Sequence, residues 1–200
     1  MRRREFIAFL GGAAIWCSLP ARAEQPDGIR RIGVLVSEPW PEVEGLHDGL
    51  RELGYREGEN VLLEYRFADG DAGRFFGLVA ELIRLPVDVI VTWGTPATLA
   101  AMKATSSIPI IMSAGDPVGA GLVSSLARPG ANVTGFSSQT AGGEEKRLEL
   151  LKVLLPNLSR VVVLSNSTNP YSVVAVQSAR RGAAALTLHS MWWTHRPSGT

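Results

Sequence analysis

The chain has 200 residues, of which 46% are hydrophobic and 20% are charged, and its formal net charge is +1. These values are typical of a globular protein with one domain or two small ones, and they argue against a disordered chain or a repeat array.

Residues 1–23 differ in character from the rest of the chain. Arginines at positions 2–4 precede an apolar segment from Phe6 to Leu19, and Ala21-Arg22-Ala23 closes it. A basic start, a short apolar stretch and an A-x-A site are the pattern of a secretory signal peptide. Residues 3–7 (RREFI) also resemble the bacterial twin-arginine export signal. We therefore expect residues 1–23 to be a signal peptide of the twin-arginine type.

Removal of this segment changes what the composition implies. It would take away four arginines, one glutamate and Cys17, the only cysteine, so the net charge would change from +1 to −2. The mature chain then lacks a basic patch for nucleic acid, a disulfide and a thiol ligand, and we expect no nucleic-acid partner, metal or cofactor. A lipoprotein anchor needs a small residue before the cysteine, where Trp16 stands. A soluble periplasmic protein is therefore expected.

From residue 30 onward, short apolar runs alternate with apolar residues at helical spacing. Strands are predicted at 32–36, 61–67, 87–91, 108–112 and 132–136, with helices around 43–53, 75–83 and 122–127 and one after Pro96. Glu64 and Arg66 interrupt the second strand, which places it near a sheet edge. This order predicts an α/β fold with a parallel doubly wound sheet, forming a first lobe at 30–137. His47 has no second ligand at metal spacing, so an ordinary surface or half-buried histidine is expected.

One turn is written three times in the sequence. Strands end at Gly94-Thr95-Pro96 and at Gly115-Asp116-Pro117, and Asn169-Pro170 follows a third strand at 161–164. A capping residue followed by proline starts a helix, and the backbone N–H groups of a helix start can hold an anion.

A second α/β lobe begins after residue 138. Residues 144–155 predict a helix, which is followed by the strand at 161–164, a helix to about residue 185 and a strand at 186–188. This partial lobe spans 138–190. The last ten residues (191–200, MWWTHRPSGT) show neither helical nor strand periodicity, and a lobe like the first would need more residues. We therefore expect an anomalous tail at 191–200 and an incomplete second lobe, as in a truncated or frame-shifted gene product.

Nine short stretches together resemble one bacterial family, the substrate-binding proteins of ABC transporters whose better-known members are associated with aromatic amino acids. The stretches are GLRELGY (49–55), EGENV (57–61), VDVIV (87–91), GTPA (94–97), IPI (108–110), GDPV (115–118), SLARPG (125–130), NVTG (132–135) and KRLELLK (146–152). The resemblance implies a type I periplasmic-binding-protein fold with a ligand in the cleft between two lobes, and no catalysis. It also implies that a membrane permease and a cytoplasmic ATPase are partners.

Candidate ligand-binding residues lie at the ends of the predicted strands. Ser37, Gly94, Thr95, Pro96 and the N–H groups after Pro96 would meet a ligand carboxylate, as expected at the carboxyl ends of parallel strands. Asp116 would pair with an ammonium group, and Asn166 and Asn169 would approach from the second lobe. Thr95, Asp116 and Asn169 can equally be simple helix caps. Trp40 and Trp93 flank the same rim and could stack on an aromatic ligand or serve packing.

Other functions fit the sequence less well. A serine hydrolase would need a G-x-S-x-G elbow, which is absent, and a dinucleotide enzyme would need G-x-G-x-x-G after the first strand. We therefore expect a binding protein and not an enzyme. A sensory ligand-binding module without a transport role, and a truncated product without function, stay open as alternatives.

Overall fold

The computed structural model describes residues 28–39, 41–138 and 143–195. In chain order the elements are β1 (Arg30–Val36), α2 (Pro41–Glu52), β2 (Val61–Phe67), the 3-10 helix η1 (Ala72–Arg74), α3 (Phe75–Arg84), β3 (Val89–Trp93), α4 (Thr95–Ala104), β4 (Ile110–Ala114), β5 (Val133–Ser137), α5 (Gly143–Leu154), β6 (Arg160–Asn166), α6 (Pro170–Ala185) and β7 (His189–His195). The call of a signal peptide at 1–23 lies outside the described residues.

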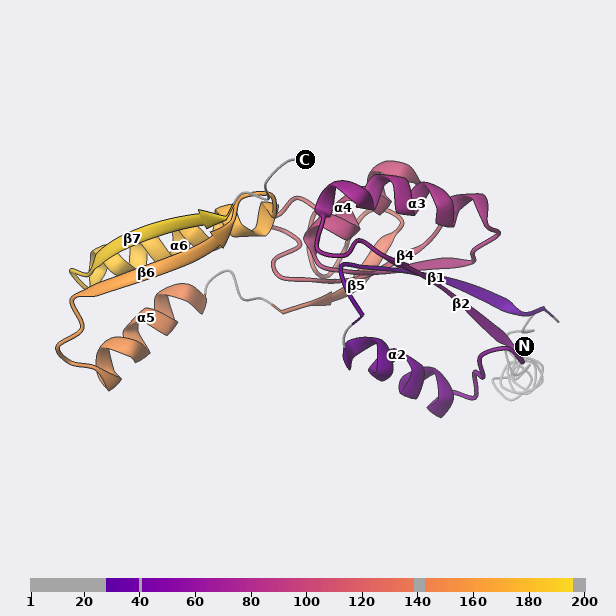
Figure 1. Cartoon of the computed structure of the whole chain (residues 1–200), viewed down its shortest axis with the longest axis horizontal. Helices are drawn as coiled ribbons and strands as arrows, with labels where there is room; N and C mark the ends of the chain where they lie inside the picture. Colours follow the sequence, from indigo (N-terminus) through magenta and orange to yellow (C-terminus); the bar gives the residue numbers. More distant parts are fainter. Residues whose placement is uncertain (1–27, 40, 139–142, 196–200) are drawn as a thin grey trace, which may run out of the picture.

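The first five strands form one sheet in the order β2-β1-β3-β4-β5, and every neighbouring pair is parallel. This confirms the predicted α/β fold with a parallel sheet, and β2 lies at an edge as predicted. Helices α3 and α4 cover one face of the sheet, while α2 lies on the opposite face (Figure 1). The main core is packed between the sheet and α3 and α4, and its fully buried side chains include Leu35, Leu82, Ile90 and Ile110.

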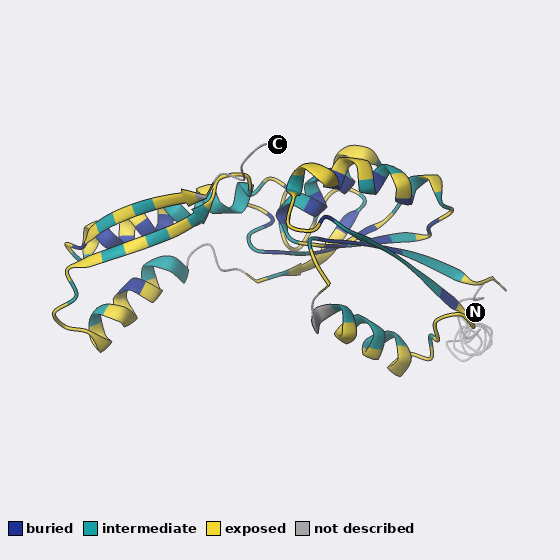
Figure 2. Cartoon of the chain, in the orientation of Figure 1, coloured by how far each residue is buried: buried dark blue, intermediate teal, exposed yellow. Residues whose placement is uncertain are grey.

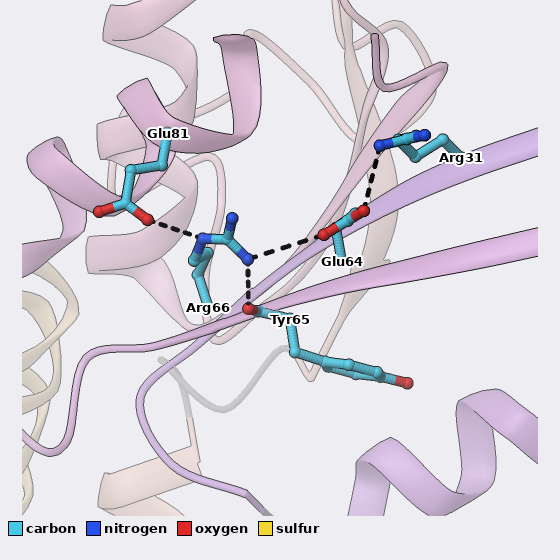
Figure 3. Close-up of polar contacts among 5 residues, drawn as sticks. All are labelled: Arg31, Glu64, Tyr65, Arg66 and Glu81. Carbon is cyan, nitrogen blue, oxygen red and sulfur yellow. Dashed lines mark hydrogen bonds and ion pairs between the residues drawn. The ribbon is translucent and has the colours of Figure 1, made fainter. Parts of the chain in front are cut away.

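The edge strand β2 carries its charged side chains in an ion-pair network (Figure 3). Arg31 Nη1 of β1 lies 3.2 Å from Glu64 Oε1, and Arg66 Nη1 lies 3.9 Å from Glu64 Oε2. Arg66 Nε also donates to Glu81 Oε2 of α3 over 2.8 Å. Charges on an edge strand discourage pairing with another chain, which explains why an otherwise apolar strand contains Glu64 and Arg66.

The contact of α2 with the sheet includes a polar group of three side chains. Tyr65 Oη of β2 lies 2.6 Å from His47 Nε2 of α2, and His47 Nδ1 lies 3.5 Å from Glu57 Oε2. His47 is half-buried, as predicted. Burial, and to a smaller extent the charge of Glu57, raises the pKa of the Tyr65 hydroxyl to about 12.

The predicted helix at 122–127 is wrong. The chain makes a single turn after β4, in which Gly119 N donates to Asp116 Oδ1 over 2.9 Å and Leu122 N donates to Pro117 O over 2.8 Å. Ser124 Oγ then donates to Arg128 O over 2.9 Å. Side-chain bonds of serine to nearby backbone compete with helix formation, and here they keep the segment in a loop.

A second, separate sheet contains β6 and β7, which pair in parallel through the crossover helix α6. Helix α5 packs on α6, and Leu148, Ala183 and Leu188 form a small core there. The strand predicted at 186–188 is wrong, because Leu186 ends α6 and Thr187 has a φ of 52°. The strand runs over His189–His195 instead, so the first half of the expected anomalous tail continues the α/β pattern. Residues 196–200 lie outside the described part.

We predict that replacing Gly135 with alanine destabilises the first sheet. Gly135 of β5 has a φ of 145°, and a Cβ there would overlap the Met112 carbonyl oxygen and lie 2.7 Å from Met112 N. Because backbone atoms cannot give way cheaply, we expect a loss of about 3 kcal/mol or more in the free energy of unfolding in urea. The matched control is Gly49→Ala in α2, where a Cβ meets open space and should stabilise by ~0.5–1 kcal/mol. An equal effect of both substitutions would contradict the argument.

The raised pKa of Tyr65 predicts a pH dependence of stability. The unfolded chain loses this proton near pH 10, whereas the folded chain keeps it up to about pH 12. The contribution is therefore complete below pH 10 and is lost as the pH rises towards 12. Urea unfolding at about pH 9 and about pH 11 should show a smaller decrease for Tyr65→Phe than for the unchanged chain. Identical decreases would show that this hydroxyl is not perturbed.

Candidate functional site

A cavity of about 310 Å³ lies at the carboxyl ends of β1 and β3. Its walls come from the end of β1, the turn before α3, the turn between β3 and α4, and the turn between β6 and α6. The lining residues are Val36, Ser37, Gly70, Ala72, Phe75, Trp93, Gly94, Pro96, Asn166 and Asn169.

The strand order explains why a cavity forms here. From β1 the chain goes first to β2 on one side, and β3 then lies on the other side, followed by β4 and β5. The connections after β1 and β3 therefore leave in opposite directions, which opens a crevice between their carboxyl ends. Ser37 follows β1, and Gly94 follows β3 directly, so both predicted residues lie at this crevice.

Two asparagines bring polar groups to the cavity from the side of the second sheet. Asn166 Oδ1 accepts from Thr168 N over 2.9 Å and from Thr168 Oγ1 over 2.7 Å. Asn169 Oδ1 accepts from Tyr171 N over 3.0 Å and so caps α6, as one reading of the sequence predicted. Both amide oxygens are therefore engaged, while neither Nδ2 donor bonds to any described residue.

The rest of the lining is largely apolar. Trp93 is 46% exposed at the end of β3, and Phe75, at the start of α3, is 4% exposed. The sequence reasoning placed Phe75 in the apolar stripe of its helix and missed it as a lining residue, together with Gly70 and Ala72. Only the pairing of β1 with β2 brings this turn beside Ser37, and no local pattern indicates that. Trp40, the other predicted aromatic residue, lies outside the described residues.

Buried hydroxyl groups shape the turn that forms one wall. Thr98 Oγ1 donates to Gly94 O over 2.9 Å, and Thr92 Oγ1 lies 2.9 Å from Thr98 Oγ1, with both threonines fully buried. Since Thr98 gives its proton to Gly94, Thr92 must donate to Thr98. The Thr95 side chain is itself 2% exposed and is not part of the lining. The predicted contribution of Thr95 is thus confined to the start of α4, whose first backbone N–H groups lie beside Gly94 and Pro96.

Asp116 also lies outside the lining of this cavity. Its carboxylate accepts from Gly119 N, the capping role that the sequence left as an alternative. The preceding residue, Gly115, is packed against the start of α6, because a Cβ there would lie 2.8 Å from Tyr171 Cδ2. The absence of a side chain at Gly115 therefore lets α6 approach the end of β4 and brings Asn169 towards the crevice.

Two further classes of site were searched for in the same residues. Across the described ranges, no three His, Cys, Asp or Glu side chains come together in a way that could hold a metal ion. Among the helices of the described part, none is long and apolar enough to cross a membrane.

We predict that Thr98→Val destabilises the turn at Gly94. The substitution keeps the shape of the side chain but leaves Gly94 O and the Thr92 hydroxyl without their partner in a buried site, which costs about 1–3 kcal/mol. Chemical denaturation measures this loss, and hydrogen exchange of residues 93–97 should become faster. Thr98→Ser keeps the hydroxyl and is the control for hydrogen bonding. If both variants behave alike, the hydroxyl does not hold this turn.

The chain matches the family model described as ABC transporter substrate binding protein over residues 32–191. It is 36% identical over 154 residues to a tyrosine-binding protein of Clostridioides difficile, a match that covers 74% of this chain and 44% of that protein.

Solved structures agree with this match. A conserved domain protein from Vibrio cholerae superposes with a TM-score of 0.77 at 32% identity, covering 83% of this chain and 57% of the other. The ABC domain of a Streptococcus pneumoniae protein in complex with L-Trp gives a TM-score of 0.75 at 30% identity, covering 84% and 58%. A leucine-binding protein from Thermotoga maritima, at 16% identity and a TM-score of 0.64, supports the fold alone.

The expected type I periplasmic-binding-protein fold is confirmed by these neighbours. The chain spans about half the length of the curated relative that it matches, and under three fifths of the first two solved structures. Over the 160 residues from 32 to 191, the chain belongs to the family of ABC transporter substrate-binding proteins.

Proposed function

We propose that this chain binds a free amino acid, with an aromatic side chain as the best fit, in the cavity at the ends of β1 and β3. The observation that carries the proposal is the lining itself, which combines residues from the first sheet with Asn166 and Asn169 from the second. A binding site made from two sheets suits a protein that closes around its ligand.

The size and the apolar wall of the cavity support this class of ligand. Its volume of about 310 Å³ lies at the lower end of the roughly 300–1,000 Å³ that small-molecule sites occupy. Trp93 exposes 46% of its surface, and Phe75 lies on the same lining. Flat aromatic side chains stack well on such residues. A curated relative is named for tyrosine binding, and one related structure contains L-Trp.

The polar groups of the lining fit the carboxylate end of an amino acid. The start of α4 offers backbone N–H groups beside Gly94 and Pro96, and the positive end of the helix dipole favours an anion there. Ser37 can add a hydroxyl donor, and Asn166 and Asn169 can each add an amide N–H. We assign Asp116 to the turn after β4, because its carboxylate already accepts from Gly119 N and lies outside the lining.

The same family membership supports proposals about location and partners. We propose that residues 1–23 direct export, that the mature protein works in the periplasm, and that it delivers its ligand to the permease of an ABC transporter driven by an ATPase. We also propose that the two sheets belong to two lobes, the first at 30–137 and the second beginning at 138.

The proposal predicts that residues 24–200 bind L-tyrosine or L-tryptophan and that Asn169→Ser weakens the binding. Serine still caps α6, so stability should change by only a few tenths of a kcal/mol. Loss of the amide donor should weaken the affinity roughly threefold to tenfold, as expected for one hydrogen bond. Isothermal titration calorimetry gives the affinity, and a urea titration gives the stability.

Asp116→Ala is the matched control for this experiment. It should lower stability by about 1 kcal/mol through loss of the turn cap while leaving the affinity unchanged. Weaker binding in Asp116→Ala would return Asp116 to the ligand site. Absence of binding for both amino acids would contradict the proposed ligand class.

A further inference from the structure

The sheet of β6 and β7 has an apolar face that no described element covers. This outer face consists of Val162, Leu164, Met191 and Trp193, whose side chains are 59%, 76%, 64% and 67% exposed. Alternating exposed and half-buried residues run along both strands (Figure 2). Four large apolar side chains gathered on one face form a patch of the kind that marks a docking surface.

The strand register shows that the four residues form one continuous surface. Val162 lies opposite Met191, and Leu164 lies opposite Trp193, so two cross-strand pairs follow each other on the same face.

The other face of this sheet is covered by α6. Trp192 is half-buried there, with the Arg180 guanidinium of α6 lying 4.8 Å from the centre of its ring. Val161 packs against the small core that Leu148 and Ala183 form. The strands are thus apolar on both faces, as is typical of parallel strands that have helices on both sides of the sheet.

The edges of this sheet are open as well. The sheet has two strands, and neither β6 nor β7 has a second neighbour within the described residues. Two parallel strands form a marginal sheet by themselves, and further parallel strands can join only through crossover connections. A suitable occupant must therefore supply strands for the edges and a helix for the outer face.

We propose that the outer face and the free edges of β6 and β7 bind an α/β segment of strands and amphipathic helices, the kind that makes up the remainder of the related binding proteins. The first three solved relatives extend well beyond the matched part, since the match covers 57%, 58% and 59% of their chains. The docking surface is the same whether that segment is joined to this polypeptide or is separate from it.

A second copy of this chain satisfies the surface less well. Twofold pairing of β7 with its copy would be antiparallel, against the parallel direction of the sheet. Face-to-face contact of two outer faces would cover the apolar residues but leave both edges unpaired. An α/β segment meets both needs at once.

The test joins the 200-residue chain, through a cleavable linker, to the segment that follows the matched region in the Vibrio cholerae protein, and separately to that of the Streptococcus pneumoniae protein. After cleavage, we expect at least one segment to co-elute with the chain as a one-to-one complex. Leu164→Glu and Trp193→Glu should each weaken that complex at least tenfold in a titration of the labelled segment. Leu53→Glu is the matched control, because Leu53 is 77% exposed after α2 and should leave the affinity unchanged.

Three results would overturn the proposal. Both segments could separate from the chain on cleavage, or the complex could be insensitive to Leu164→Glu and Trp193→Glu. The chain alone could also form a dimer that Leu164→Glu converts to a monomer, which would assign the face to a second copy. Circular dichroism of each variant checks that the exposed substitutions leave the fold of the chain intact, and none of these measurements uses the amino-acid ligand.

Discussion

The parallel pairing of β1 with both β2 and β3 is the constraint on which the rest of this structure depends. Parallel neighbours require crossover connections, so α2, η1 with α3, and α4 must each return the chain to the same end of the sheet. All carboxyl ends then lie together, and the change of direction beside β1 separates the two connections that leave it. The cavity at Ser37 and Gly94 is a direct consequence of that topology.

The predictable parts of the fold are those set by local chemistry. Apolar runs located the strands of the first sheet, Glu64 and Arg66 identified its edge, and Asn169 caps α6 as its position before Pro170 predicts. Hydrogen bonds between side chain and backbone caused the main errors. Ser124 holds the segment after β4 in a loop, and the left-handed Thr187 delays the last strand until His189.

The site was predictable only where a strand end carried its own polar signal. Ser37, Gly94 and Asn166 each follow or end an apolar run, and they lie on the cavity. Phe75 belongs to a helix that starts far from β3 in the sequence, so its place beside Trp93 depends on the sheet order. Asp116 shows the opposite case, because a strand end supplies an acid that the backbone of its own turn then binds.

The two sheets differ in how far each completes its own packing, and this difference bears on the cavity. The first sheet has a core between its strands and α3 and α4, and therefore holds Ser37 and the Gly94 turn on a packed scaffold. Asn166 and Asn169 depend on β6 and α6, whose sheet has two strands and an uncovered face. A binding site is only as ordered as its least supported wall. Coverage of Leu164 and Trp193 would therefore steady the asparagine side of the cavity without touching the ligand, and ligand affinity would rise with it through reduced ordering cost.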